Sequence, residues 1–316
     1  MTTEELKHAT RLCIEHDDDI NVEVFIVLKN HEIRKANFLH TLQPEIITIF
    51  KPIIATKILD ADYSLLNVSS ADERRNAIYY YDLDLTEQLL IFHQVLNGEN
   101  NFPYFSFEHD EVNNIDAFLF VIGNAEHQIV LYKRLASVNI YQQRTGLFIR
   151  KEDNQFAKLE SDVIKIVPQI DAFMVNGAIF FLNLTILENA FHIHDVVKTS
   201  ARQQIALLED YGLIENIDSL EMELENISFA RKFSKLITNS PVLGKVDNHR
   251  IVDFTTTHPA LRNKFKYNAD RTKIKLTTKL SKKLFVKLLN DDYLTSNLTE
   301  QYYDSMAKDV VSIQVE

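Results

Sequence analysis

The hydrophobic pattern of this chain changes its period near residue 185, and this change limits the possible folds more than any other feature. Between residues 115 and 184, short runs rich in Val, Ile and Phe are separated by Gly, Asn and Asp, which is typical of antiparallel strands joined by turns. The dipeptide Asn176-Gly177 is the strongest hairpin signal. The predicted strands are IDAFLFVIG (115–123), HQIVLYKRL (127–135), GLFIRKE (146–152), DVIKIV (162–167), IDAFMVNG (170–177) and AIFFLNL (178–184).

After residue 184, apolar residues recur at spacings of three and four, which predicts helices with breaks near Gly212 and Ser240-Pro241. The front of the chain is mixed: we expect a strand at 20–29, a helix-like stretch at 31–59 bounded at Pro44 and Pro52, and a helix over 84–98 ending at Gly98. The predicted class is therefore α+β. Residues 1–185 form a mixed part with a mainly antiparallel β-sheet, and residues 186–316 form a mostly helical part that contains a basic β-hairpin.

Composition favours an ordered globular protein of one large domain or two domains. The chain has 316 residues, of which 46% are hydrophobic and 25% are charged. Cys13 is the sole cysteine, and the start MTTEELKHATRL lacks the pattern of a secretory signal, so we expect a cytoplasmic protein. The apolar run at 178–187 has about half of the roughly 20 residues that a bilayer span needs. Any association with a membrane would therefore require a partner.

Positive charge is concentrated in one segment of an otherwise acidic chain. Residues 262–287 contain ten Lys or Arg residues and one acid, Asp270, for a net charge of +9. Since the whole chain carries -11, the other 290 residues carry -20. Such segregation predicts an oriented docking surface for a polyanion. The alternative is that these lysines pair with the carboxylates of the protein itself.

The basic segment contains two sequence patterns, an alternation typical of strands followed by a spacing typical of a helix. Lys264 and Lys266 alternate with apolar residues, as do Lys273 and Lys275, and NADR between them has turn chemistry, which predicts a hairpin with a lysine face. The following TKLSKKLFVKLL has helical period, with lysines along one side and Leu280, Leu284, Phe285 and Leu288 on the other. Nothing in the segment argues for base readout. The predicted DNA-binding residues are Arg262, Lys264, Lys266, Arg271, Lys273, Lys275, Lys279, Lys282, Lys283 and Lys287.

Known catalytic and metal-binding signatures find little support. The six glycines are isolated, so no phosphate-cradling loop is expected, and no GxSxG or HExxH motif occurs. The one Glu-x-Lys, at residues 5–7, has no aspartate before it as a nuclease site would need. EHDDD (15–19) and FHIHD (191–195), with Glu188 one turn before His192, are weak metal candidates. We therefore predict no metal, no cofactor and no enzymatic activity.

Three segments resemble a known family. FARKFSKLITNSPVL (229–243), IDAFMVNGAIFFLNLTILENAF (170–191) and TKIKLTTKLSKKLFVKLLNDDYLTSNLTEQYYDSMAKD (272–309) are similar to the KwaB-like family of the Kiwa anti-phage defence system. KLLNDDYLTSNLT (287–299) is the most specific element. The resemblance implies a bacterial defence protein that binds DNA, has no established catalytic site and works beside a small multi-pass membrane partner, KwaA.

Together, the residues and the resemblance predict a non-enzymatic effector that binds duplex DNA without sequence preference and obstructs phage DNA. Asn290, Asp291 and Asp292 end the basic helix and are interpreted as a turn or partner contact. Two alternatives stay open. One is a metal-dependent nuclease that uses Asp291, Asp292 and Asp304, and the other is a scaffold whose basic segment docks the membrane partner. We expect a homodimer or higher homo-oligomer.

Overall fold

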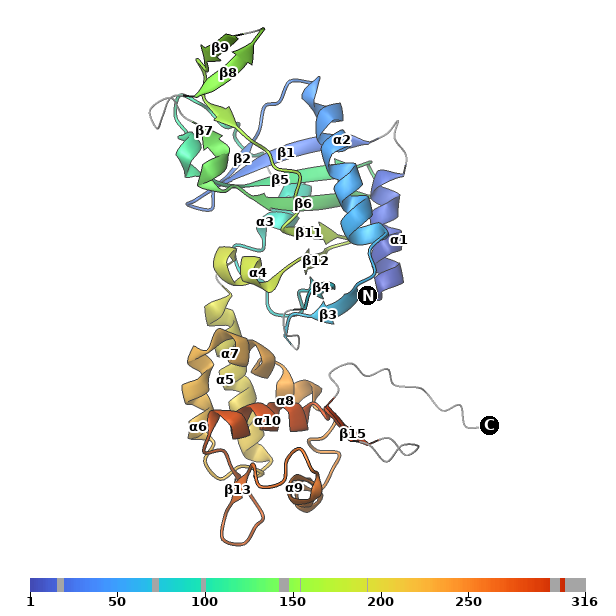
Figure 1. Cartoon of the computed structure of the whole chain (residues 1–316), viewed down its shortest axis with the longest axis vertical. Coiled ribbons are helices and arrows are strands. Elements are labelled where there is room, and N and C mark those ends of the chain that lie inside the picture. Colours follow the sequence, from blue (N-terminus) through green and yellow to red (C-terminus); the bar gives the residue numbers. More distant parts are fainter. Residues whose placement is uncertain are drawn as a thin grey trace, which may run out of the picture. The chain divides into compact units, whose positions relative to one another are not determined.

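The computed structural model describes residues 1–15, 20–69, 74–97, 101–141, 148–153, 155–191, 193–295 and 302–304, the last few from residue 294 by their backbone alone (Figure 1). These residues form two compact units. The first contains the described residues of 1–67 and 74–191, and the second contains Val68, Ser69 and the described residues from Ile193 onward.

The first unit is built on an eight-stranded sheet in which every neighbouring pair except β3–β4 is antiparallel. This confirms the predicted α+β class. In spatial order the strands are β2 (Ile33–Lys35), β1 (Asn21–Leu28), β5 (Ile115–Gly123), β6 (Gln128–Arg134), β11 (Ala172–Val175), β12 (Ala178–Phe181), β4 (Ala77–Tyr80) and β3 (Ser64–Asn67).

The predicted Asn-Gly hairpin joins β11 to β12. Asn176 and Gly177 both have positive φ, 50° and 73°, as the two-residue turn that matches strand twist requires. The central strands are buried on both faces, which explains why their sequences read as nearly continuous apolar runs.

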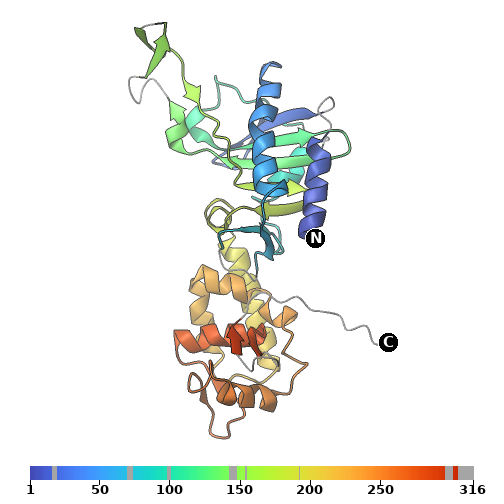
Figure 2. The ribbon, with the colours of Figure 1, turned by 45° about the vertical axis from the view of Figure 1, so that its right-hand side comes forward.

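Helices α1 (Thr3–Ile14) and α2 (Leu42–Ile54) cover one face of the sheet, as Figure 2 shows. Phe50 of α2 packs on Phe120 of β5 with ring centroids 4.5 Å apart. On the other face, Tyr132 of β6 contacts Phe92 of α3 (Ile91–Leu96) and Phe191, which follows α4 (Leu184–Ala190). These contacts place α4 in the first unit, whereas the predicted boundary at residue 185 lies inside this helix.

Some predicted elements differ from the observed ones. Within the described residues, 148–152 and 162–167 do not join the main sheet. Instead β8 (Ile149–Glu152) pairs with β9 (Gln155–Lys158), and β10 (Val163–Ile164) pairs with β7 (Ile140–Tyr141). The residues of β8 are all exposed. Because IRKE carries one apolar side chain, it has no apolar face to bury in a sheet.

The predicted helix boundaries in the front part were also partly wrong. Pro44 lies in the first turn of α2, where its missing N–H costs little, and the helix continues through Pro52 into a wider turn, η2 (Ala55–Leu59). The predicted 84–98 helix is reduced to α3, preceded by turns that Thr86 Oγ1 helps to hold by accepting from Leu89 N. Gly98 lies outside the described residues. Helix α1 was not predicted, although the Thr2–Glu5 capping box at its start is a signal that the sequence contains.

The second unit is mostly helical, as predicted, and its described residues include two short β-ribbons. Gln204 in α5 joins this long helix to α8, because its Oε1 accepts from Ile237 N and Thr238 N at 2.9 Å. The helices are α5 (His194–Asp210), α6 (Asp218–Glu221), η6 (Met222–Glu225), α7 (Ile227–Phe233), α8 (Leu236–Asn239), α9 (Asn248–Thr257) and α10 (Lys279–Leu289). The ribbons are β13 (Lys266–Tyr267) with β14 (Ile274–Lys275), and β15 (Tyr293–Thr295) with β16 (Tyr302–Asp304). Short one-turn helices also occur in the first unit, namely η3 (Val112–Asn114) and η4 (Ser137–Asn139).

Candidate nucleic-acid interface

The basic hairpin forms where it was predicted, with a shorter ladder. Lys266 pairs with Lys275, and Tyr267 pairs with Ile274, while Lys264 lies in the turn before β13. Asn268 organises the loop: its Oδ1 accepts from Thr272 N and Lys273 N at 2.8 and 2.9 Å. An Asn side chain that bonds its own turn explains why the loop is ordered without glycine.

The hairpin has the two faces that its alternation predicts. Phe265, Ile274 and Leu276 are buried, whereas Lys264, Lys266 and Lys273 are exposed. Lys266 and Lys275 are opposite each other in the ladder, and like charges so placed are unfavourable by up to ~1 kcal/mol unless an anion lies over them.

The segment after α5 anchors the inner strand. Ile274 N donates to Leu213 O at 2.9 Å, and Glu215 N donates to Ile274 O at 3.1 Å. The Asn216 side chain both accepts from Leu276 N and donates to Leu276 O. These bonds hold the lysine face in a fixed position on the second unit.

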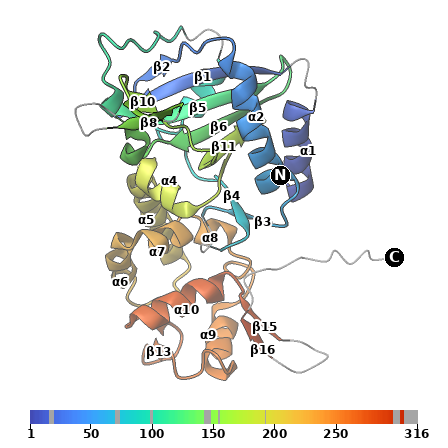
Figure 3. The same ribbon diagram turned by 45° about the horizontal axis from the view of Figure 1, so that its top comes forward.

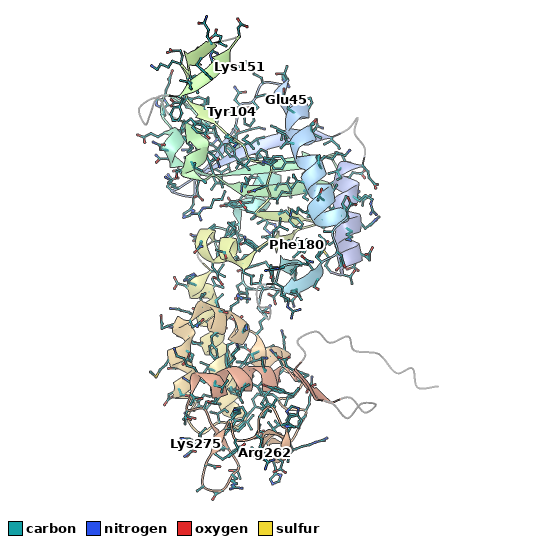
Figure 4. All side chains as sticks on the ribbon, in the orientation of Figure 1. Glu45, Tyr104, Lys151, Phe180, Arg262 and Lys275 are labelled. Atoms are coloured by element: carbon teal, nitrogen blue, oxygen red, sulfur yellow. The ribbon has the colours of Figure 1, made fainter. Side chains whose placement is uncertain are left out.

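One hairpin lysine is paired within the protein. Lys275 Nζ lies 2.9 Å from Glu215 Oε2, but both side chains are about two-fifths exposed, so the pair is screened by water. The other basic residues in and next to the hairpin are exposed and make no ion pair with any residue that the structure describes. They are Arg262, Lys264, Lys266, Arg271 and Lys273. Arg262, which precedes the hairpin, and Lys275, which belongs to it, are labelled in Figure 4.

Helix α10 follows the hairpin and begins with a capping box of Thr278 and Ser281. Lys279 and Lys283 are exposed on it and Lys287 is half-buried. Lys282 is buried, and its Nζ lies 2.9 Å from Glu223 Oε1, so it is turned into the fold. The predicted apolar side is also not fully buried, because Leu280 is 52% exposed.

Asn290, Asp291 and Asp292 form the turn that ends α10. Asp291 has φ +56°, Asp291 N donates to Leu288 O, and Asp292 N donates to Lys287 O. This is a Schellman motif, in which a residue with positive φ ends the helix and two amides bond its last carbonyls. The geometry agrees with the interpretation of these residues as a structural turn.

Among the described residues, the other sequence candidates do not form an assembled site. Residues 16–19 of EHDDD, as well as His192 and the Asp304 side chain, lie outside the described residues. Across the described ranges, no group of three or more His, Cys, Asp or Glu side chains could hold a metal ion. Cys13 is buried, and this burial raises its pKa to about 12, which does not suit a nucleophile at neutral pH.

Lys232 was not among the predicted DNA-binding residues. This residue belongs to α7, far from the basic segment in sequence, yet it lines the same cleft as Lys279, Lys283 and Lys287. The signal available was the basic pair Arg231-Lys232 in FARKF, which spacing alone could not connect to α10. The basic residues therefore form two groups. One group lies on the hairpin, and the other consists of the α10 lysines together with Lys232.

The family comparisons extend the resemblance beyond residues 170–309. Kiwa protein KwaB of Escherichia coli O55:H7 (strain RM12579) is 28% identical over 314 residues, which cover 98% of this chain and 99% of that protein. No solved structure gives a significant match. The family model described as Kiwa protein KwaB-like matches residues 112–299, which is 188 of 316 residues. Since this is more than half of the chain, the protein belongs to the KwaB-like family of the Kiwa anti-phage defence system.

Proposed function

We propose that the protein serves Kiwa defence by binding the phosphate backbone of phage duplex DNA, without cleaving it, and thereby obstructing that DNA. The observation that carries this proposal is the outward face of the hairpin. Five basic side chains, Arg262, Lys264, Lys266, Arg271 and Lys273, are exposed there without ion pairs among the described residues. Their apolar neighbours are buried, so the charged face has a fixed direction.

Duplex DNA suits this face for an electrostatic reason. DNA carries one negative charge per ≈ 1.7 Å of helix axis, and lysines that neutralise phosphates release counterions. Lys is a compact point charge that contacts phosphate without reading bases. Binding is therefore expected to be independent of sequence and to weaken steeply with salt.

The charge of the rest of the chain orients the complex. Residues outside 262–287 carry -20, which repels DNA from the other surfaces at low ionic strength. The basic segment is thus the favoured contact, and Lys279, Lys283 and Lys287 of α10 extend it beyond the hairpin.

Partners form part of the same proposal. Within the described part of the chain, no helix has the length and apolar character needed to cross a bilayer. We propose that KwaA, the membrane subunit implied by the family resemblance, recruits the protein to the inner membrane, and that the protein acts as a homodimer or higher homo-oligomer. No cofactor is required for this function.

A matched pair of charge reversals tests the proposal. Affinity for a duplex of about 20 base pairs is measured by fluorescence anisotropy from about 50 to 200 mM salt, with and without Mg²⁺. The test variant is K264E/K266E. The control is K151E/K158E, which changes the net charge equally and replaces two exposed lysines on the β8–β9 ribbon.

We expect wild-type affinity to fall with salt, and the magnitude of the log–log slope to fall by about 2 in the hairpin variant, one for each lost phosphate contact. The control should retain the wild-type slope. Equal losses in both variants would contradict the hairpin assignment. Cleavage of DNA with Mg²⁺ would support the nuclease alternative, and absence of DNA binding together with binding to KwaA would support the scaffold.

A further inference from the structure

A cleft of about 280 Å³ in the second unit is lined by residues of α7 and α10, both of which are labelled in Figures 1 and 3. Four lysines line it, Lys232 from α7 and three from α10. The volume is close to the lower end of the ≈ 300–1,000 Å³ range of small-molecule sites. The space therefore suits a ligand about as large as one nucleotide.

The charges around the cleft favour an anion. Four lysines and two carboxylates, those of Glu223 and Asp292, line the cleft, so its formal net charge is +2. Glu223 is already engaged by Lys282 at 2.9 Å, and Asp292 is buried at the end of α10. Lys279 and Lys283 make no ion pair with any described residue. Cations gathered on a concave surface focus the field and attract a negatively charged ligand.

An aromatic ring lies among these lysines. Phe229 lines the cleft and is half-buried, whereas its neighbour Phe233 is fully buried, with ring centroids 5.7 Å apart and planes inclined by 23°. Phe233 therefore holds the Phe229 ring from the protein side. An aromatic side chain next to basic groups is the combination on which a nucleic-acid base stacks while its phosphate is bound.

Polar groups complete the wall. Asn226 uses its Oδ1 to cap α7 by accepting from Phe229 N at 3.2 Å, which leaves its Nδ2 as a donor at the cleft. The Ser228 side chain is exposed there. A few polar groups around an apolar surface and several cations are typical of a site that orients a nucleoside phosphate.

We infer that the α7–α10 cleft binds a nucleoside phosphate, with the phosphate at the α10 lysines and the base against Phe229. The ligand is either a free nucleotide or the terminal nucleotide of a single strand, since both present the same chemistry. The inference deepens the proposed function, on which it rests for the role of the α10 lysines in contacting nucleic acid. It assigns to Phe229 and Lys232 a role that backbone contact with duplex DNA does not require.

The test measures binding of dAMP, inorganic phosphate and a single-stranded oligonucleotide with or without a 5′-phosphate to the full chain. F229L keeps an apolar contact with Phe233 and removes the aromatic face, and F156L is its control because Phe156 is 79% exposed on the β8–β9 ribbon. K283E is compared with K264E, which has the same charge change on the hairpin. Circular dichroism and urea midpoints verify that each variant folds.

We expect dAMP to bind more tightly than phosphate and F229L to weaken dAMP binding about five- to a hundredfold, the range that loss of one stacked base gives. F156L should have no effect, and K283E should weaken dAMP binding more than K264E does. Dependence of oligonucleotide binding on the 5′-phosphate would identify a strand end as the ligand, and binding of dAMP alone would identify the free nucleotide.

Two results would overturn the inference. One is binding of dAMP no tighter than phosphate with no effect of F229L, which would reduce the cleft to a simple anion site. The other is no binding of dAMP or oligonucleotide by a folded wild-type chain that still binds duplex DNA, which would leave the proposed function intact. Conversely, dAMP binding without duplex binding would contradict the proposed function and support the binding of a nucleoside phosphate at the α7–α10 cleft.

Discussion

Lys282 Nζ lies 2.9 Å from Glu223 Oε1, and the two side chains are only 10% and 17% exposed. The ion pair joins α10 to η6, and it removes one of the ten basic residues of the segment from the surface. A lysine that faces a carboxylate at low exposure is not available to DNA, and removing one partner of such a pair leaves the other charge buried without its counterion.

Breaking this pair should destabilise the protein. K282M leaves Glu223 with little water and no cation, and we expect a loss of about 2–4 kcal/mol in the free energy of unfolding, measured in urea. The double variant K282M/E223L should recover much of that loss. K198M is the control, because Lys198 pairs at 2.6 Å with Glu225, which is 76% exposed, and its removal should cost about 1 kcal/mol or less. Similar losses in K282M and K198M would contradict the buried role of Lys282.

Asn268 should control the order of the basic loop. N268A removes the acceptor of Thr272 N and Lys273 N, so we expect these two amides to lose protection from hydrogen exchange. The Ile274 amide, which donates to Leu213 O, should stay protected and serves as the control. DNA affinity should fall several-fold because the loop lysines are less preorganised. Unchanged protection at residues 272 and 273 would show that the loop does not depend on the Asn side chain.

Asp291 occupies a position that favours glycine. Its φ of +56° costs a residue with a Cβ about 1 kcal/mol, so D291G should raise the free energy of unfolding by about 0.5–1 kcal/mol. D291A should lower it, since Ala tolerates this conformation less well than Asp. Thermal unfolding of both variants tests the sign. A loss of stability in D291G would mean that the carboxylate, and not the backbone, matters at this position.

Cys13 should be unreactive in the folded protein. Burial raises its pKa from 9.0 to about 12, so alkylation at pH 8 should be slow in the native state and proceed at the usual rate in urea. Because the folded-state pKa is the higher one, the stabilising effect is complete below about pH 9 and is lost as pH rises towards 12. C13A should lack this component of the pH dependence. Rapid stoichiometric alkylation of the native chain would contradict the burial of the thiol.

Much of the sheet was readable from the sequence because local pattern encodes it. The runs at 115–123, 127–135 and 170–184 are apolar, rich in β-formers and bounded by turn residues, and they form four adjacent strands. The parallel β3–β4 pair had no such signal, because pairing between strands depends on what the rest of the chain brings together. Likewise, Pro52 predicted a helix end, but packing of α2 on the sheet retained the helix across it.

The basic segment shows the same division. Alternation and turn chemistry determined that residues 264–276 form a hairpin with a lysine face, and helical period determined α10, because both depend on spacing within a few residues. Only the tertiary structure decided that Lys282 faces Glu223, that Lys275 faces Glu215, and that Lys232 lies in the same cleft as the α10 lysines. The physical reason is that the period of a sequence fixes which side chains share a face, whereas the neighbour of that face is fixed by the packing of elements distant in the chain.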